Sequence, residues 1–317
     1  MGTALVVLER PALPVELTAT LELAADFAKA SKAPATQAAY GSDFRIFEAW
    51  CTARGICALP ATPAALCGFL ADEATVGRRA STLGRRLAAI RYFHRAAGHD
   101  SPTSDEAVKA TLSGIRRTIG AAPVRKRAAT SDMVIAMSAT GTSLRALRDR
   151  AIILLGFAGA FRRSELVALD VNDLEEAPEG LWITIRRSKT DQEGLGRKVA
   201  IPRGEIACPV AALKAWLEAA GIAEGAVFKR AQRVADRRLA ARNVATIVKA
   251  AAAKLGLEAA AFAGHSLRAG FVTSAVKRGA NLIKITDVTG HRSLEMLKTY
   301  YSRDAEAFVG HAGPGLL

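Results

Sequence analysis

The sequence predicts a mainly α-helical protein built from an all-helical N-terminal domain and a mixed α/β, mostly helical C-terminal domain with a small antiparallel sheet. Apolar residues recur with a period near 3.6 over most of the chain, as in amphipathic helices. A β-branched, strand-like pattern appears only within residues 181–201. A basic segment of small residues and a proline, 120–129, separates the two parts. We therefore expect domains at 1–119 and 130–317, joined by a linker at 120–129.

The N-terminal part contains four stretches with helical spacing. Pro63 fits the first turn of the second stretch, because its missing N–H has no partner there in any helix. In the third stretch, Leu83, Leu87 and Ile90 form one apolar stripe, and we assign them and His94 to the core. The four expected helices are 36–50, 63–71, 81–97 and 105–119.

The C-terminal part begins with a helix from the capping pair Ser131–Asp132 to about residue 139. A long, increasingly apolar helix over 143–161 is expected to be buried. Strands at 181–185 and 199–201 flank a polar, glycine-containing turn and predict a hairpin. Further helices are expected at 209–220, 241–255, 266–278, 281–289 and 293–301.

Composition narrows the function classes. Lys and Arg number 44 against 30 Asp and Glu, a net charge of +14, and both parts are basic, which points to a polyanion such as nucleic acid. The longest apolar run, 151–161, is too short to span a membrane, and residues 4–8 are too short for a signal peptide. The four cysteines form no CxxC pair, so we expect a reducing cytoplasm rather than a disulfide or cysteine-zinc module.

Four segments of the C-terminal part gather the residues that a phosphate-directed site needs. Arginine binds phosphate oxygens with a two-pronged fork, a helix N-terminus favours an anion, and histidine exchanges protons near neutral pH. The segments are 160–166 (AFRRSEL), 186–191 (RRSKTD), 264–270 (GHSLRAG) and 289–301 (TGHRSLEMLKTYY).

Each segment alone also has an ordinary structural interpretation. Arg162 with Glu165 would be a surface ion pair, and Lys189 a solvated charge on a turn. His265 would cap a helix beside Arg268, and the adjacent tyrosines would be partly buried. No single segment therefore assigns a function.

Together the segments give the order Arg, Lys, His-x-x-Arg, His, Tyr, which closely resembles the signature of the tyrosine recombinases, or phage integrase family. AFRRSEL is similar to the family's G-L-R-x-S-E-L box, with Phe161 in place of leucine, and HSLRAG matches its H-x-L-R-x-G box. The family's tyrosine lies nine positions after the second histidine, which selects Tyr300 over Tyr301. Residues 82–95 look like part of the family's helical core-binding domain, which has a SAM-like fold.

The resemblance implies that Tyr300 attacks a DNA phosphodiester, forms a 3′-phosphotyrosine and releases a 5′-hydroxyl. A free tyrosine has a pKa of about 10, so its ionisation at pH 7 costs about 4 kcal/mol unless cations or a base assist. Arg162 and Arg268 would bind the non-bridging oxygens and stabilise the charge of the transition state.

The remaining roles are also implied by the resemblance. His265 would act as general base or acid, and His291 would hydrogen-bond a non-bridging oxygen and help hold the tyrosine. Lys189 would protonate the 5′-oxygen. Glu165 would repel a phosphate, so we expect it to orient Arg162 or its neighbours.

We expect no cofactor, metal or ATP, because arginines supply the positive charge and the covalent intermediate conserves the bond energy. The expected partners are duplex DNA with a short core site and three further copies in a tetramer on DNA, with a free monomer, no membrane, and a nucleoid-associated cytoplasmic location. A short C-terminal segment, 304–309, would dock subunits, and no separate arm-binding domain is expected. The residues expected to contact DNA are Arg78, Arg85, Arg86, Arg91, Arg125, Lys126 and Arg127.

Two alternatives share the signature. A type IB topoisomerase uses the same strand-transfer chemistry as a monomer with little sequence choice, although the helical N-terminal domain argues against it. A non-catalytic DNA-binding protein could keep the fold, although all six expected catalytic positions hold competent residues.

Overall fold

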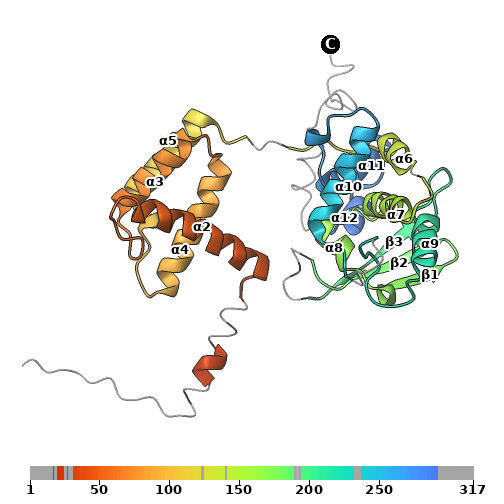
Figure 1. Ribbon diagram of the computed structural model, residues 1–317, viewed down its shortest axis with the longest axis horizontal. Helices are drawn as coiled ribbons and strands as arrows, with labels where there is room; N and C mark the ends of the chain where they lie inside the picture. Colours follow the sequence, from red (N-terminus) through yellow and green to blue (C-terminus); the bar gives the residue numbers. More distant parts are fainter. Residues whose placement is uncertain are drawn as a thin grey trace, which may run out of the picture. The chain divides into compact units, whose positions relative to one another are not determined.

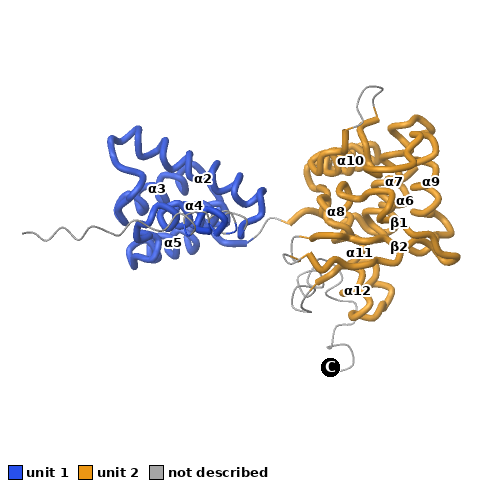
Figure 2. The backbone as a smooth tube through the Cα atoms, turned by 90° about the horizontal axis from the view of Figure 1, so that it is seen from below, with its two compact units in different colours: residues 1–124 blue, residues 125–317 orange. Residues whose placement is uncertain are grey.

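The computed structural model forms two compact units, residues 1–124 and 125–317, each described here by itself (Figure 2). The boundary falls inside the expected linker. No helix among the described residues is long and apolar enough to cross a bilayer. The described residues are 17, 20–24, 27, 31–122, 125–139, 141–188, 191, 194–231 and 237–291.

The first unit is helical throughout its described part, and its four main helices are those predicted (Figure 1). Thr62 accepts a hydrogen bond from the Ala65 amide and Pro63 follows it, so the second helix begins where the sequence indicates. It ends four residues later than predicted. The elements are α2 (Pro34–Thr52), α3 (Pro63–Thr75), α4 (Ala80–Ala96), the 3-10 helix η1 (Pro102–Ser104) and α5 (Glu106–Ile119).

An aromatic and aliphatic core holds these helices together. Phe47 of α2, Phe69 of α3 and Leu83 of α4 are fully buried and belong to one cluster. His94 is equally buried: its Nε2 accepts from the Ala61 amide at 2.9 Å, so Nδ1 carries the proton and donates to the Ile90 carbonyl. His94 is therefore a structural residue, as the sequence indicated.

The second unit combines nine helical segments of the described chain with one three-stranded antiparallel sheet of order β1-β2-β3. Its first elements are α6 (Ser131–Ser138), α7 (Leu144–Ala158), α8 (Arg163–Ala168), η2 (Val171–Asp173), β1 (Leu174–Ala177), β2 (Gly180–Ile185) and β3 (Arg197–Pro202). The others are α9 (Pro209–Ala220), α10 (Ala241–Lys254), η3 (Ala259–Ala261), α11 (His265–Lys277) and α12 (Leu282–Thr289).

Three details differ from the sequence prediction. The long helix ends at Ala158 rather than 161, because Ala160 turns the chain with a φ of 46°. Two short elements, α8 and β1, were not expected, since neither is long enough to show a period. The N-cap of α6 is Thr130, without a side-chain cap bond. The helix expected at 293–301 lies outside the described residues.

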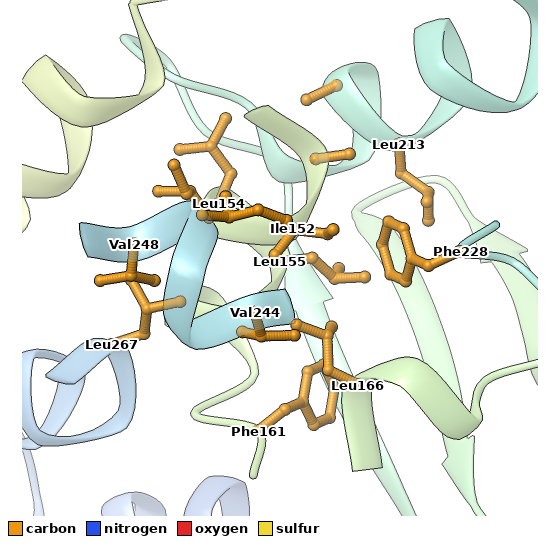
Figure 3. Close-up of a cluster of buried hydrophobic side chains, with 14 of the residues drawn as sticks. Ile152, Leu154, Leu155, Phe161, Leu166, Leu213, Phe228, Val244, Val248 and Leu267 are labelled. Carbon is orange, nitrogen blue, oxygen red and sulfur yellow. The ribbon is translucent and has the colours of Figure 1, made fainter. Parts of the chain in front are cut away.

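Helix α7 forms the centre of the core, where it packs against α6, α9, α10, α11 and β3 (Figure 1). Ile152 and Leu155 of this helix are fully buried. Phe161 within the α7–α8 turn and Leu166 of α8 belong to the same cluster (Figure 3). The turn that follows α7 is therefore held on both sides by close-packed apolar side chains.

The second half of the expected linker belongs to the second unit. The Arg127 amide donates to the Ala261 carbonyl at 2.7 Å, and the fully buried Ala129 donates to Ser266. The Arg127 guanidinium lies over the Phe262 ring, and Lys126 Nζ donates to the Ala260 carbonyl at 2.6 Å. Lys126 and Arg127 thus contact the second unit, to which this half of the expected linker belongs.

Gly270 of α11 packs against the linker segment at Ala129, so a substitution at Gly270 tests how firmly that segment is attached to the second unit. A Cβ at this position would overlap the carbonyl of Ala129, which is backbone and cannot move aside cheaply. We expect Gly270→Ala to destabilise the second unit by about 1–3 kcal/mol. Gly114→Ala, on α5 with open space around it, should instead stabilise the first unit by up to about 1 kcal/mol. Calorimetry of the full chain measures the unfolding transition of each unit. An unchanged unfolding temperature of the second unit in Gly270→Ala would contradict the contact between Gly270 and Ala129.

Candidate active site

The first site segment is the sharp turn between α7 and α8. Ala160 adopts the left-handed region without being glycine, a conformation that costs about 1–3 kcal/mol, and the buried Phe161 follows it. Arg162 then occupies the N-cap of α8. Its backbone amide donates to Glu165 Oε2 at 2.9 Å and its Nη1 donates to Oε1 at 2.6 Å. Glu165 thus fixes both the main chain and the side chain of Arg162.

Arg268 is the most deeply buried charged residue of the site, at 1% exposed. Its Nη1 donates to the Ala160 carbonyl at 2.8 Å, across 108 positions of sequence. Its Nη2 donates to Nε2 of His291 at 2.9 Å. Because a buried guanidinium is costly unless it is hydrogen-bonded, these contacts link α11 firmly to the α7–α8 turn and to the end of α12.

The hydrogen bonds of His291 assign its neutral form. Nε2 accepts from Arg268, so the proton lies on Nδ1, which donates to Thr289 Oγ1 at 2.8 Å. Thr289 in turn donates to the Ile285 carbonyl at 2.7 Å. The pKa of His291 is lowered to about 4, first by burial and then by Arg268 and the other cations nearby.

His265 opens α11 and is exposed, three positions before the buried Arg268. Its charge also lowers the pKa of His291, as does that of Arg162, so all of these groups face one region. An exposed imidazole at the edge of a cationic site is open to proton exchange with a ligand or solvent.

Arg197, the first residue of β3, was not predicted as a site residue from the sequence. Its Nη2 lies 3.7 Å from Glu165 Oε2, and its Nη1 donates to the Val288 carbonyl at 2.8 Å. Burial lowers its pKa, and Glu165 opposes that effect. The alternation of β3, in which Val199 and Ile201 point inward, was the signal that would have placed Arg197 on the same side.

Lys189 and Tyr300 lie outside the described residues. The hairpin that carries Lys189 leaves β2 at Arg186, which forms ion pairs with Asp170 at 2.6 Å and Asp173 at 3.0 Å. The chain that carries Tyr300 leaves the described part at His291. The structure therefore describes the residues from which each segment departs, Arg186 and His291. The positions of the Lys189 and Tyr300 side chains stay predictions.

The described residues make an anion site. Three guanidiniums and an imidazole act on His291, and the one buried carboxylate among them, Glu165, pairs with Arg162 and Arg197, so the described site carries excess positive charge. The described chain contains no group of three or more His, Cys, Asp or Glu side chains arranged to hold a metal. Such an arrangement suits a phosphate-like oxyanion held by forked arginine contacts.

In the first unit, Arg86 corrects the sequence prediction. We expected it to face DNA, yet it is 5% exposed and pairs with Glu73 and Asp43. Arg85 is largely exposed but forks onto Asp43, with Nε–Oδ2 and Nη2–Oδ1 distances of 2.6 and 2.9 Å. Arg86 is therefore structural, because it neutralises carboxylates from two other helices.

The other two residues of this unit that we expected to contact DNA, Arg78 and Arg91, are exposed. Arg78 lies 3.7 Å from Glu73, and Arg91 Nε donates to Thr103 Oγ1 at 2.9 Å. Their expected contacts with DNA stay predictions.

The second unit thus brings arginines and histidines from separate segments together in one basic site, which suits an oxyanion such as a phosphate. Residues 126–307 match the model of the phage integrase family. The chain belongs to this family and is a tyrosine site-specific recombinase.

Curated relatives agree with this assignment. The chain is 40% identical over 281 residues to an integrase/recombinase xerD homolog of Selenomonas ruminantium, covering 85% of this chain and 82% of the relative. It is 31% identical over 274 residues to tyrosine recombinase XerC of Mycobacterium bovis, covering 84% and 87%.

Solved structures share the fold. The Tn1549 transposon integrase in complex with transposon right end DNA aligns with a TM-score of 0.60 at 17% identity, covering 88% of this chain and 93% of that one. A lambda integrase dimer bound to a COC' core site aligns with a TM-score of 0.59 at 17% identity, covering 92% and 81%.

The buried ion pairs of Arg86 predict a stability effect. Arg86→Met should destabilise the first unit by about 3–5 kcal/mol, because it leaves buried carboxylates uncompensated. Arg95→Met, on the exposed face of the same helix, should change the stability by no more than about 0.5 kcal/mol. Thermal unfolding distinguishes the two, and equal stabilities would contradict the structural role of Arg86.

The neutral form of His291 predicts its titration. NMR of histidine-labelled protein should show His291 taking up a proton only near pH 4. Since the unfolded chain binds that proton near pH 6.5, the stabilisation from neutral His291 is complete above pH 6.5 and is lost as the pH falls toward 4. A titration near pH 6.5 in the folded protein would show that the contact with Arg268 does not persist in solution.

Proposed function

We propose that this recombinase cleaves and rejoins DNA strands through a 3′-phosphotyrosine intermediate on Tyr300, without metal or ATP. The observation that carries the proposal is the convergence of Arg162, Arg268 and His291, which come from three separate segments of the second unit. The family assignment and the tyrosine nine positions after His291 support the choice of nucleophile.

The two family arginines supply the electrostatic part of catalysis. In the proposed reaction Arg162 and Arg268 bind the non-bridging oxygens of the scissile phosphate. Both are already fixed by hydrogen bonds, Arg162 to Glu165 and Arg268 to Ala160, so little reorganisation is needed when charge develops. Preorganised donors of this kind are typically worth about 3–4 kcal/mol each in the transition state.

The bound phosphate also changes His291. Without DNA, its neutral ring accepts from Arg268 and has no proton on Nε2 to donate. A phosphodiester beside it offsets the nearby guanidinium charges and raises the pKa of His291. The imidazole then gains a proton on Nε2 and donates it as a hydrogen bond to a non-bridging oxygen.

Proton transfer completes the scheme. His265, exposed at the start of α11, takes the proton of the Tyr300 hydroxyl. The tyrosine oxygen bonds to phosphorus while the bond to the 5′-oxygen breaks, and Lys189 gives that oxygen a proton. Rejoining reverses these steps with a 5′-hydroxyl as nucleophile, so the phosphoryl bond is exchanged rather than hydrolysed.

The DNA partner follows from charge and from the relatives. The chain carries a net charge of +14, and related integrase structures are described as bound to DNA. We propose that the chain acts on chromosomal DNA in the cytoplasm, where the first unit grips a short core site and four copies assemble. DNA affinity would then fall steeply with salt, as counterions are released from the phosphates.

The nucleophile assignment predicts a clear result from one substitution. The purified protein is incubated with fragmented genomic DNA from cells that express it. We expect a covalent protein–DNA adduct that survives denaturing detergent. Tyr300→Phe should abolish this adduct, because the attacking oxygen is lost, while Tyr301→Phe should retain it. An excess of EDTA should leave the yield unchanged.

Sequencing the trapped junctions identifies the target site. An adduct that persists in Tyr300→Phe would refute the assignment. Relaxation of any supercoiled plasmid without recombinant products would indicate a topoisomerase instead, and binding without cleavage would indicate a non-catalytic protein.

A further inference from the structure

Arg197 joins three parts of the site that the family signature treats as separate. It is the first residue of β3, directly after the hairpin turn expected to carry Lys189. Its Nη1 donates to the Val288 carbonyl in the last turn of α12, and its Nη2 lies 3.7 Å from Glu165 Oε2. One side chain therefore connects the hairpin, the end of α12 and the carboxylate that orients Arg162.

Burial decides how this residue acts. The Arg197 side chain is 21% exposed, and its Nη2 atom has essentially no exposed surface. No described residue accepts a hydrogen bond from Nη2, and 3.7 Å to Glu165 is an ion-pair distance. Nη1 is bonded to the Val288 carbonyl and Nη2 faces Glu165, so Arg197 acts through these neighbours rather than on DNA.

The contact with α12 fixes the approach to His291. The Val288 carbonyl is one of the four at the end of a helix that lack an intrahelical partner, where a cation is favourable. Gly290 ends α12 in the left-handed conformation, and a Cβ there would lie 2.9 Å from Arg197 Nε. The chain thus passes against the guanidinium immediately before His291.

We propose that Arg197 is a positioning residue of the recombination site, which holds the end of α12 so that His291 meets Arg268 and which balances the charge of Glu165. The inference rests on the proposed function, because it assigns Arg197 to the phosphoryl transfer at that site. No box of the signature that identified the other site residues contains this arginine.

Electrostatics gives the proposal an independent readout. The charged and titratable groups that act on His291 are Arg268 and His265 of α11, Arg162 at the start of α8, and Arg197 of β3. Each lowers the pKa of His291. Removal of the Arg197 charge therefore moves that pKa upward, which a residue with a merely structural role would not do.

Two substitutions at Arg197 separate the effect of its positive charge from the effect of its two-pronged guanidinium, which reaches two partners at once. Arg197→Met removes both, whereas Arg197→Lys keeps the charge but cannot reach Val288 and Glu165 at once. The matched control is Lys198→Met. Lys198 is the next residue of β3, points outward and pairs with Glu175 at 2.8 Å.

The experiment measures three quantities on the full chain: the single-turnover rate of adduct formation on the trapped target DNA, the affinity for that DNA, and the NMR titration of His291. Arg197→Met should slow adduct formation by about 100-fold, in line with a displacement of about 1 Å at a catalytic group, and should change the affinity far less. It should also raise the pKa of His291. Arg197→Lys should slow the reaction while leaving that pKa low, and Lys198→Met should match the wild type in all three.

Two results would overturn the proposal: a wild-type rate in Arg197→Lys, or an unchanged His291 titration in folded Arg197→Met. If Arg197→Met does not fold, the rate of Arg197→Lys decides. A wild-type chain that forms no Tyr300 adduct refutes the proposed function instead, and the His291 titration still reports on the contact of Arg197.

Discussion

The site depends on one buried guanidinium, that of Arg268. It is 1% exposed, and its two terminal nitrogens bond the Ala160 carbonyl and the His291 ring. Loss of either partner would leave a buried donor unsatisfied, at a cost of about 1–3 kcal/mol or more for a charged group. Two contacts stabilise the strained backbone at Ala160. Its carbonyl accepts a hydrogen bond from the Arg268 guanidinium, and the next residue, Phe161, is buried in the core (Figure 3). Binding geometry and core packing are therefore maintained by the same contacts.

Around Arg268 the described residues gather more positive than negative charge. Glu165 offsets Arg162 and part of Arg197, and His291 avoids a further charge by remaining neutral. A site assembled in this way is complementary to an oxyanion before any ligand enters, which is the condition for electrostatic preorganisation. The apolar cluster around α7 supplies the stability that such a concentration of like charges removes.

Sequence periodicity predicted the long elements because each buries one face of a regular repeat. It could not predict α8 and β1, which are six and four residues long and whose conformations are set by Glu165 and by pairing with β2. Nor could it predict that Arg86 is buried, since its partners Glu73 and Asp43 come from other helices. The resemblance to a family named the residues of the site but not their mutual contacts, so Arg197, which lies in none of the quoted boxes, was missed.

The proposed function makes the protonation of His291 the link between DNA binding and chemistry. In the described contacts its Nε2 accepts a hydrogen bond from Arg268. Nε2 can therefore donate a hydrogen bond to a phosphate only after the ring gains a proton. Burial and the neighbouring cations lower its pKa to about 4, and in the proposed reaction the effect of these cations weakens once the negative charge of a phosphate lies beside them. By linkage, a phosphate that raises this pKa must bind more tightly to the protonated protein, so phosphate entry and proton uptake promote each other. In the proposed reaction the imidazole thus becomes a donor only when a scissile phosphate is present, and until then it keeps Arg268 hydrogen-bonded within the protein.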